Sequence, residues 1–177
     1  MKKRRLSGTE AKENALTLLN LGADLLAQGK PNDALDHLEQ AYRLDAGSVA
    51  VCINLGGAYV MCGRHKKAIP ILEAARDAEP GNSMIWINLG AAYLGNPILA
   101  TTEQQSRAIA AFEKALEINP AAPNVHYNLG LIFVDRGDRE LAIAAFRRAM
   151  QVNPCDRDAL HWLGKLEAAQ QRDDEPA

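Results

Sequence analysis

Four asparagines recur along the chain at steps of 34, 34 and 40 residues, and their side chains are suited to one kind of chemistry. An amide group both donates and accepts hydrogen bonds, so a row of amides can hold the backbone of an extended peptide whatever its side chains are. The same amide can instead bond a neighbouring helix of its own protein. Both interpretations are open for these residues, which are Asn20, Asn54, Asn88 and Asn128.

Groups that could perform catalysis or bind a metal do not converge in the sequence. None of the histidines has the paired ligand spacing of an HExxH zinc site. The cysteines form no CxxC pair, and there is neither a phosphate-binding glycine loop nor a nucleophile elbow. We therefore predict a protein that is not an enzyme and has no catalytic residue, metal site or cofactor. The residues considered are His37, His65, His126, His161, Cys52, Cys62 and Cys155.

Composition narrows the class of partner and the compartment. A formal net charge of −2 gives no long-range field suited to nucleic acid, so nucleic acid is not expected as a partner. The basic run 2–5 precedes polar residues and lacks the apolar stretch of a secretory signal. Three cysteines are a sparse, odd count that fits a reducing compartment. No membrane span is expected. We expect a cytoplasmic protein.

The asparagines belong to a longer pattern that repeats through the chain. Each is followed two residues later by a glycine, and columns of alanine and of large apolar residues repeat with nearly the same period. The third unit holds six extra residues, which lie between Gly90 and Ala108. Four in-phase copies of this length are typical of stacked helix–turn–helix units. The columns are Gly22, Gly56, Gly90 and Gly130; Ala34, Ala68, Ala108 and Ala142; and Leu38, Leu72, Phe112 and Phe146.

The fullest copy of the pattern consists of Trp86, Leu89, Gly90, Tyr93, Ala108, Phe112, Ala115 and Pro120. On these residues, and on the matching set in the fourth unit, the chain resembles the tetratricopeptide repeat family over residues 15–156. The resemblance implies an all-α fold, a right-handed α-solenoid of antiparallel helix pairs. It also implies that the first helix of each pair lines a concave groove into which the asparagine row points.

The period predicts how the chain divides. The expected segments are a basic tail with the start of the first helix (1–14), four repeats (15–48, 49–82, 83–122 and 123–156), a capping helix (157–171) and a disordered tail (172–177). The insertion near residues 96–102 is either a functional loop or a tolerated lengthening of a turn. Thr101 or Thr102, with Gln104 or Gln105, predicts a capping box that restarts the helix after it.

Each first helix carries one predicted packing stripe, which in the second repeat is Cys52, Leu55, Gly56 and Tyr59. A glycine inside a helix costs about 1 kcal/mol relative to alanine. Its repeated use therefore predicts that the second helix comes close at that point. We expect the alanine column of the second helix to supply the matching small surface.

The groove side of the first helices is predicted to be apolar, and in the first three repeats it holds no charged residue. An apolar surface that the chain itself leaves uncovered marks a partner site. The alternatives are a superhelix tight enough to fill its own groove, or residues 1–14 lying in it. The predicted apolar contacts are Leu19, Ile53, Met61, Met84, Ile87 and Tyr127.

Together these features predict a non-enzymatic module that binds a peptide or hydrophobic segment of another protein, extended or apolar, in the concave groove. An architectural role is the main alternative, in which the same surface closes a homo-oligomer. An RNA-binding helical repeat is a third, and the lack of basic residues in the groove disfavours it.

Overall fold

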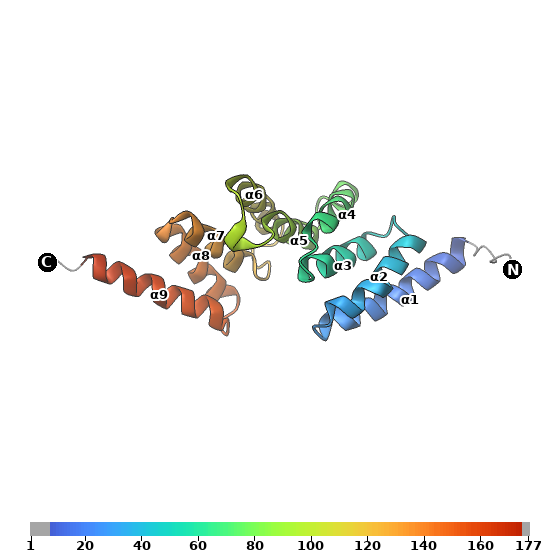
Figure 1. The fold of residues 1–177 in the computed structure, drawn as a ribbon, viewed down its shortest axis with the longest axis horizontal. Helices are drawn as coiled ribbons and strands as arrows, with labels where there is room; N and C mark the ends of the chain where they lie inside the picture. Colours follow the sequence, from blue (N-terminus) through green and yellow to red (C-terminus); the bar gives the residue numbers. More distant parts are fainter. Residues whose placement is uncertain (1–7, 175–177) are drawn as a thin grey trace.

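The computed structural model describes residues 8–174, which form nine α-helices and one short 3-10 turn, with no β-strand among them (Figure 1). The predicted all-α fold is confirmed. The elements are α1 (Gly8–Ala27), α2 (Pro31–Leu44), α3 (Val49–Met61), α4 (His65–Ala78), α5 (Ser83–Leu94), η1 (Pro97–Leu99), α6 (Thr102–Ile118), α7 (Val125–Arg136), α8 (Arg139–Val152) and α9 (Arg157–Asp174).

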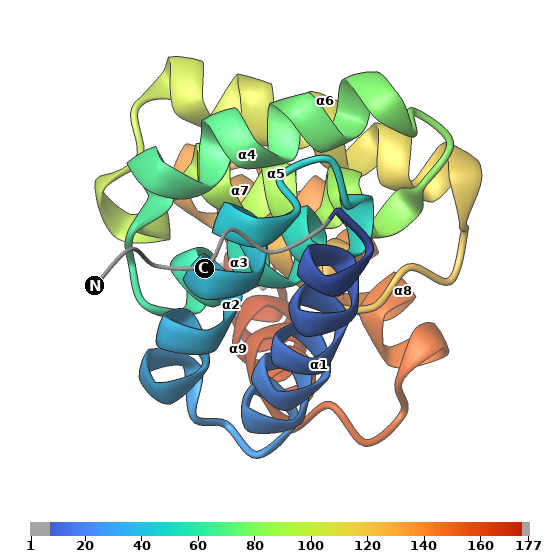
Figure 2. The same cartoon turned by 90° about the vertical axis from the view of Figure 1, so that its right-hand side faces the viewer.

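The helices stack as four pairs, α1–α2, α3–α4, α5–α6 and α7–α8, and α9 packs against α8 (Figure 1). The result is an elongated helical-repeat solenoid. Viewed along its length, the second helices α2, α4, α6 and α8 lie at the periphery, and the first helices lie nearer the axis (Figure 2). First helices also contact one another directly, α1 with α3 and α3 with α5.

Glycines make the tight turns inside the pairs. Gly63, between α3 and α4, has φ +69°, a left-handed conformation that side chains with a Cβ rarely adopt. In the third pair the chain leaves α5 through Gly95, with φ +64°, and then enters η1. A glycine is therefore needed wherever a first helix ends sharply.

The insertion is an ordered turn followed by a longer helix. Thr101 caps α6: its Oγ1 accepts a hydrogen bond from Gln104 N, and Gln104 Oε1 accepts one from Thr101 N. This confirms the predicted capping box. Helix α6 has 17 residues, whereas α2, α4 and α8 have 14. Gln105, 3% exposed, donates to Asp135 Oδ2 at 2.6 Å and accepts from Arg136 Nε at 2.9 Å. The start of α6 is thus tied to the next pair.

The predicted close approach at the glycine column is present, but its partner differs from the expectation. A Cβ atom placed on Gly56 would lie 2.5 Å from Leu72 Cδ2, and one on Gly130 would lie 2.7 Å from the Phe146 ring. The large apolar column of the second helix, not its alanines, fills the space that glycine leaves. The expectation failed because a helix side chain reaches well beyond its Cβ, so a bare backbone can accept a whole ring. Alanines such as Ala68 are also fully buried.

Polar links join successive pairs at the end of the packing stripe. The Tyr59 hydroxyl donates to Glu39 Oε1 at 2.8 Å, and the Tyr93 hydroxyl donates to Glu73 Oε1 at 2.7 Å. Burial, together with the Glu39 bond, raises the pKa of Tyr59 to about 12. At the last junction Arg147 Nη2 lies 2.7 Å from Glu167 Oε1. Each link crosses from a second helix to the next first helix.

The helix ends refine the predicted segments. Helix α1 spans Gly8–Ala27, so residues 8–14 form part of it. The predicted disordered tail is wrong for residues 172–174, which continue α9 as far as Asp174. The basic run 2–5 and residues 175–177 lie outside the described residues.

The glycine contact generates a paired stability test. Gly90→Ala should lower the free energy of unfolding by about 1–3 kcal/mol, because its Cβ would overlap the buried Phe112 ring. This loss should appear although alanine favours a helix by about 1 kcal/mol. Gly164→Ala in α9 is the control: nothing lies within 4 Å of its Cβ position, so it should be stabilising. Urea unfolding followed by circular dichroism measures both. Equal stabilisation by the two substitutions would contradict a close contact between Gly90 and Phe112.

Candidate functional site

The asparagine row lies on the first helices, and its members differ in how they are bonded. Asn88 Nδ2 donates to the Ile53 carbonyl at 3.2 Å, which joins α5 to α3. A Cβ on Gly57 would lie 3.5 Å from the same amide nitrogen. Asn54 Nδ2 donates to the Ala50 carbonyl at 2.9 Å, within its own helix. Each of these two amides therefore already donates one hydrogen bond within the protein.

Asn20 and Asn128 keep their amide groups free of hydrogen bonds to other described residues. Asn20 is exposed on α1, and Asn128 is half-buried on α7. They stand near the two ends of the row. The two middle asparagines of the row therefore form hydrogen bonds within the fold, and the two end ones form none with the other described residues.

The two methionines are the most exposed of the predicted apolar contacts. Met61, the last residue of α3, is 56% exposed, and Met84, in the first turn of α5, is 44% exposed. Ile53, Ile87 and Tyr127 are half-buried. A surface suited to apolar contact is thus present, with its largest exposed area on flexible methionine side chains.

Leu19 is a correction to the predicted contact set. It is 8% exposed and belongs to the main hydrophobic core, so it has little surface to offer a partner. Neighbouring first helices touch, and this packing covers part of the side that the helical period alone assigns to the groove.

Leu16 and Leu21 on α1 are exposed apolar side chains that were not among the predicted contacts. Leu21 occupies the packing-stripe position of the first repeat, at which the equivalent Leu55 and Leu89 are buried. Helices α3 and α5 each pack against the second helix of the preceding pair as well as against that of their own pair, and no pair precedes α1 among the described residues.

Three side chains at one repeat position, Cys52, Trp86 and His126, contribute to packing. Trp86 Nε1 donates to the Pro80 carbonyl at 2.7 Å, and Cys52 Sγ lies 3.6 Å from the Ala46 carbonyl at the equivalent place. His126 takes this position in the fourth repeat, where burial lowers its pKa although a bond to the Pro120 backbone opposes the shift. A neutral imidazole is consistent with a structural role.

Within residues 8–174, no group of three or more His, Cys, Asp or Glu side chains is arranged to hold a metal ion. In the same part of the chain, no helix has the length and apolar character needed to cross a membrane.

Comparison with known families supports the repeat architecture. A family model described as tetratricopeptide repeat matches residues 25–92, and a second so described matches residues 127–175. A third model, described as TPR repeat, matches residues 99–137. No curated protein sequence matches the chain.

Solved structures share the fold. One is TTC0263, a thermophilic TPR protein from Thermus thermophilus, with a TM-score of 0.75 and 21% identity over 89% of this chain and 84% of that one. Another is MamA, from residue 41 to its end, of Desulfovibrio magneticus RS-1, with a TM-score of 0.66 and 24% identity over 85% and 81%. A further crystal structure of MamA gives 0.64 and 27% over 83% and 86%. We take the fold from these likenesses.

The different bonding of the asparagines can be tested by stability. Asn88→Ala should lower the free energy of unfolding by about 1 kcal/mol, because it removes the side-chain hydrogen bond that joins α5 to the Ile53 carbonyl of α3. Asn20→Ala is the matched control on exposed α1 and should change stability by less than about 0.5 kcal/mol. Urea unfolding at one protein concentration measures both. If the two variants lose the same stability, Asn88 has no structural role.

Proposed function

Because the chain belongs to the tetratricopeptide repeat family, we propose that it is a non-enzymatic interaction module that binds a segment of another protein along its concave first-helix surface. The observation that supports this most is the exposure of two large apolar side chains on first helices, Met61 on α3 and Met84 on α5. Complete burial of a methionine by a partner contributes about 1.5–3 kcal/mol.

The half-buried side chains of this surface would extend the contact. Ile53 and Ile87 are half-buried on the same helices as the methionines, while Tyr127 packs edge-on to Phe146 with the ring centroids 5.8 Å apart. A side chain held in this way adds apolar area at little entropic cost when a partner binds.

The amides would fix the backbone of the bound segment. Asn20 and Asn128 offer both donor and acceptor, whereas Asn54 and Asn88 each keep a second N–H and the amide oxygen. A segment held by amides at intervals would bind extended, with its apolar side chains toward the methionines.

Two other uses of this surface are outcomes of the tests below. Homo-oligomerisation would cover the same methionines with a second copy of the chain. An RNA-binding role would require cations that the first-helix contacts lack. The proposal includes a cytoplasmic location, because the cysteine count suits a reducing compartment and Cys52, Cys62 and Cys155 are unpaired.

A peptide selection tests the groove. Peptides are selected against the full chain from a displayed random library, and their affinities are measured by fluorescence anisotropy. We expect apolar peptides whose affinity falls at least about tenfold in the Met61→Asp/Met84→Asp variant, since two buried apolar contacts become desolvated charges. Both sites are exposed, so helical circular dichroism should be unchanged.

The control places the same charges on a second helix. Leu141→Asp/Val152→Asp alters two exposed apolar residues of α8 and should leave peptide affinity within about twofold. Equal losses in both variants would refute the groove. Sedimentation velocity over a range of concentrations addresses the alternative: self-association that Met61→Asp/Met84→Asp abolishes would favour the homo-oligomer.

A further inference from the structure

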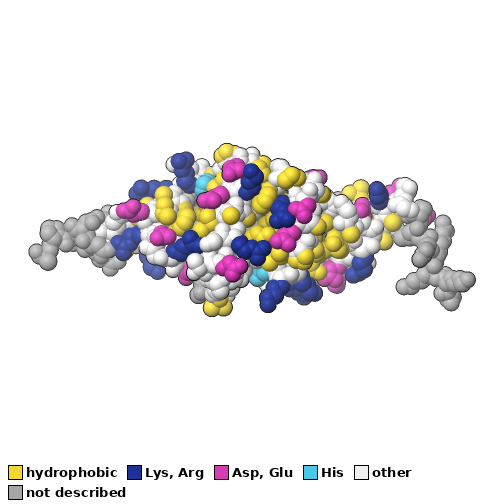
Figure 3. Space-filling view, turned by 90° about the horizontal axis from the view of Figure 1, so that it is seen from above, with side chains coloured by type: hydrophobic (Ala, Val, Ile, Leu, Met, Phe, Trp, Pro, Cys, Tyr) yellow, Lys and Arg dark blue, Asp and Glu magenta, His cyan; other side chains and the backbone are white. Residues whose placement is uncertain are grey.

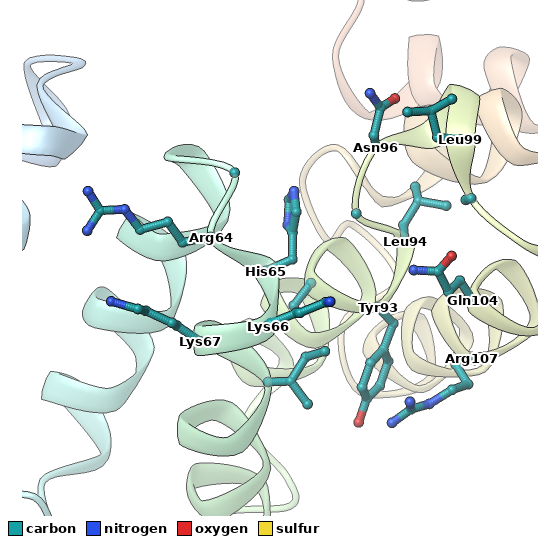
Figure 4. A pocket seen from close by; sticks show the side chains of 15 residues that line it. Arg64, His65, Lys66, Lys67, Tyr93, Leu94, Asn96, Leu99, Gln104 and Arg107 are labelled. Atoms are coloured by element: carbon teal, nitrogen blue, oxygen red, sulfur yellow. The ribbon is translucent and has the colours of Figure 1, made fainter.

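A cavity of about 540 Å³ lies at the edge of the array, where the turns within the pairs are located (Figure 4). One wall is the α3–α4 turn with the start of α4, and the other is the end of α5, the insertion and the first turns of α6. We call it the insertion pocket. Its volume is in the range of ligand-binding sites, and none of the predicted groove residues lines it.

The lining of the insertion pocket is basic. Arg64, Lys66, Lys67 and Arg107 contribute to it, and no Asp or Glu does. Arg107 is already compensated, with its Nη2 3.4 Å from Glu73 Oε1 and its guanidinium 4.0 Å from the centre of the Tyr93 ring. Lys67 Nζ lies 5.6 Å from the centre of the Tyr59 ring.

Among the basic side chains of the pocket, Lys66 is the one placed to bind a ligand. Its side chain extends across the pocket toward Tyr93 and Gln104, whereas Arg64 and Lys67 point away (Figure 4). Lys66 forms no hydrogen bond or ion pair with the described residues. Burial lowers the pKa of the adjacent His65, which is therefore neutral near pH 7 and forms a wall beside Gly95.

Apolar side chains make up much of the remaining surface. Ile69 and Leu94 belong to the core and its surroundings, and Leu99 in η1 is 77% exposed at the rim. Hydrophobic side chains also gather in the middle of the face seen from above, among scattered charges (Figure 3). A free inorganic anion would make no favourable contact with these apolar side chains. The pocket therefore suits a ligand that combines a negative charge with an apolar group.

The chemistry favours protein over nucleic acid as the source of that charge. Single-stranded nucleic acid binds by stacking its bases on aromatic rings. The phenol ring of this pocket, Tyr93, has one face covered by Arg107 and its hydroxyl bonded to Glu73. The formal net charge of −2 also opposes a long polyanion.

We propose that the insertion pocket binds an acidic protein segment, with a carboxylate beside Lys66 and a leucine-sized apolar side chain against Leu99 and Ile69. This is a second site, distinct from the first-helix groove, and it gives the six-residue insertion a function. The capping box at Thr101 and the Gln105 bonds to Asp135 and Arg136 hold the α6 wall of the pocket in place. Little conformational entropy is therefore lost when a ligand binds.

A labelled synthetic peptide with one leucine flanked by glutamates tests the proposal by fluorescence anisotropy with the full chain. Lys66→Glu should weaken binding about tenfold or more, because it removes an attraction and adds a repulsion. Lys12→Glu on α1 changes the net charge equally and should alter affinity by less than about twofold.

The apolar part is tested with a second pair of molecules. Leu99→Ser should weaken binding of the leucine peptide about fivefold, whereas a peptide with serine in place of leucine should bind both proteins alike. Leu99 is exposed, so this variant should keep its fold. Met61→Asp/Met84→Asp should leave pocket binding intact, which separates this proposal from the groove.

Three outcomes would overturn the proposal. The first is an equal effect of Lys66→Glu and Lys12→Glu, which would mean attraction by net charge alone. The second is an absence of saturable peptide binding below about 1 mM. The third is a single-stranded oligonucleotide that binds more tightly than the peptide and is lost in Lys66→Glu, which would assign the pocket to nucleic acid.

Discussion

The array depends on how closely the two helices of each pair approach, and a glycine facing a large apolar side chain sets that distance. The filling residue is leucine in the first two pairs and phenylalanine in the next two, yet the glycine is the same in all four. The backbone of the first helix, rather than a matching side chain, is thus the fixed element. A pair built on this contact is a rigid unit, and variation is left to the junctions and the surfaces.

The junctions show that one geometric link can be made with different chemistry. Tyr59 and Tyr93 reach back to glutamates of the preceding second helix, and at the end of the array Glu167 pairs with Arg147 instead. A sequence comparison of one column alone treats Glu167 as a lost aromatic residue. In the column of Glu39, Glu73 and Arg147, the acidic residue is on the second helix in the first two cases and is replaced by arginine in the last. The acid of that last pair is Glu167, on the following helix. Paired columns therefore contain information that single columns lack.

The sequence predicted the pairing of the helices well, but it did not predict which equivalent side chains are buried. The 34-residue period and the glycine column were enough to predict helix pairs, and Thr101 with Gln104 predicted where α6 begins. Leu19 and Ile53 occupy equivalent positions, but one is buried and the other half-buried. Asn54 and Asn88 are likewise equivalent, yet only Asn88 bonds the neighbouring helix. Helical period fixes the angle of a side chain, while neighbouring helices decide whether that angle faces protein or solvent.

An insertion at a turn is an economical way for such an array to acquire a new surface. Each pair contacts only its neighbours, so residues added at the edge leave the stack in register. Lengthening a short turn to about twice its size costs roughly 0.6 kcal/mol of chain entropy. A capping box contributes about 1 kcal/mol, enough to offset that cost. The bonds from Gln105 to α7 then anchor the longer helix to the next pair. The insertion therefore adds an ordered surface at the edge of the array, and its 3-10 turn also contacts α7 of the next pair.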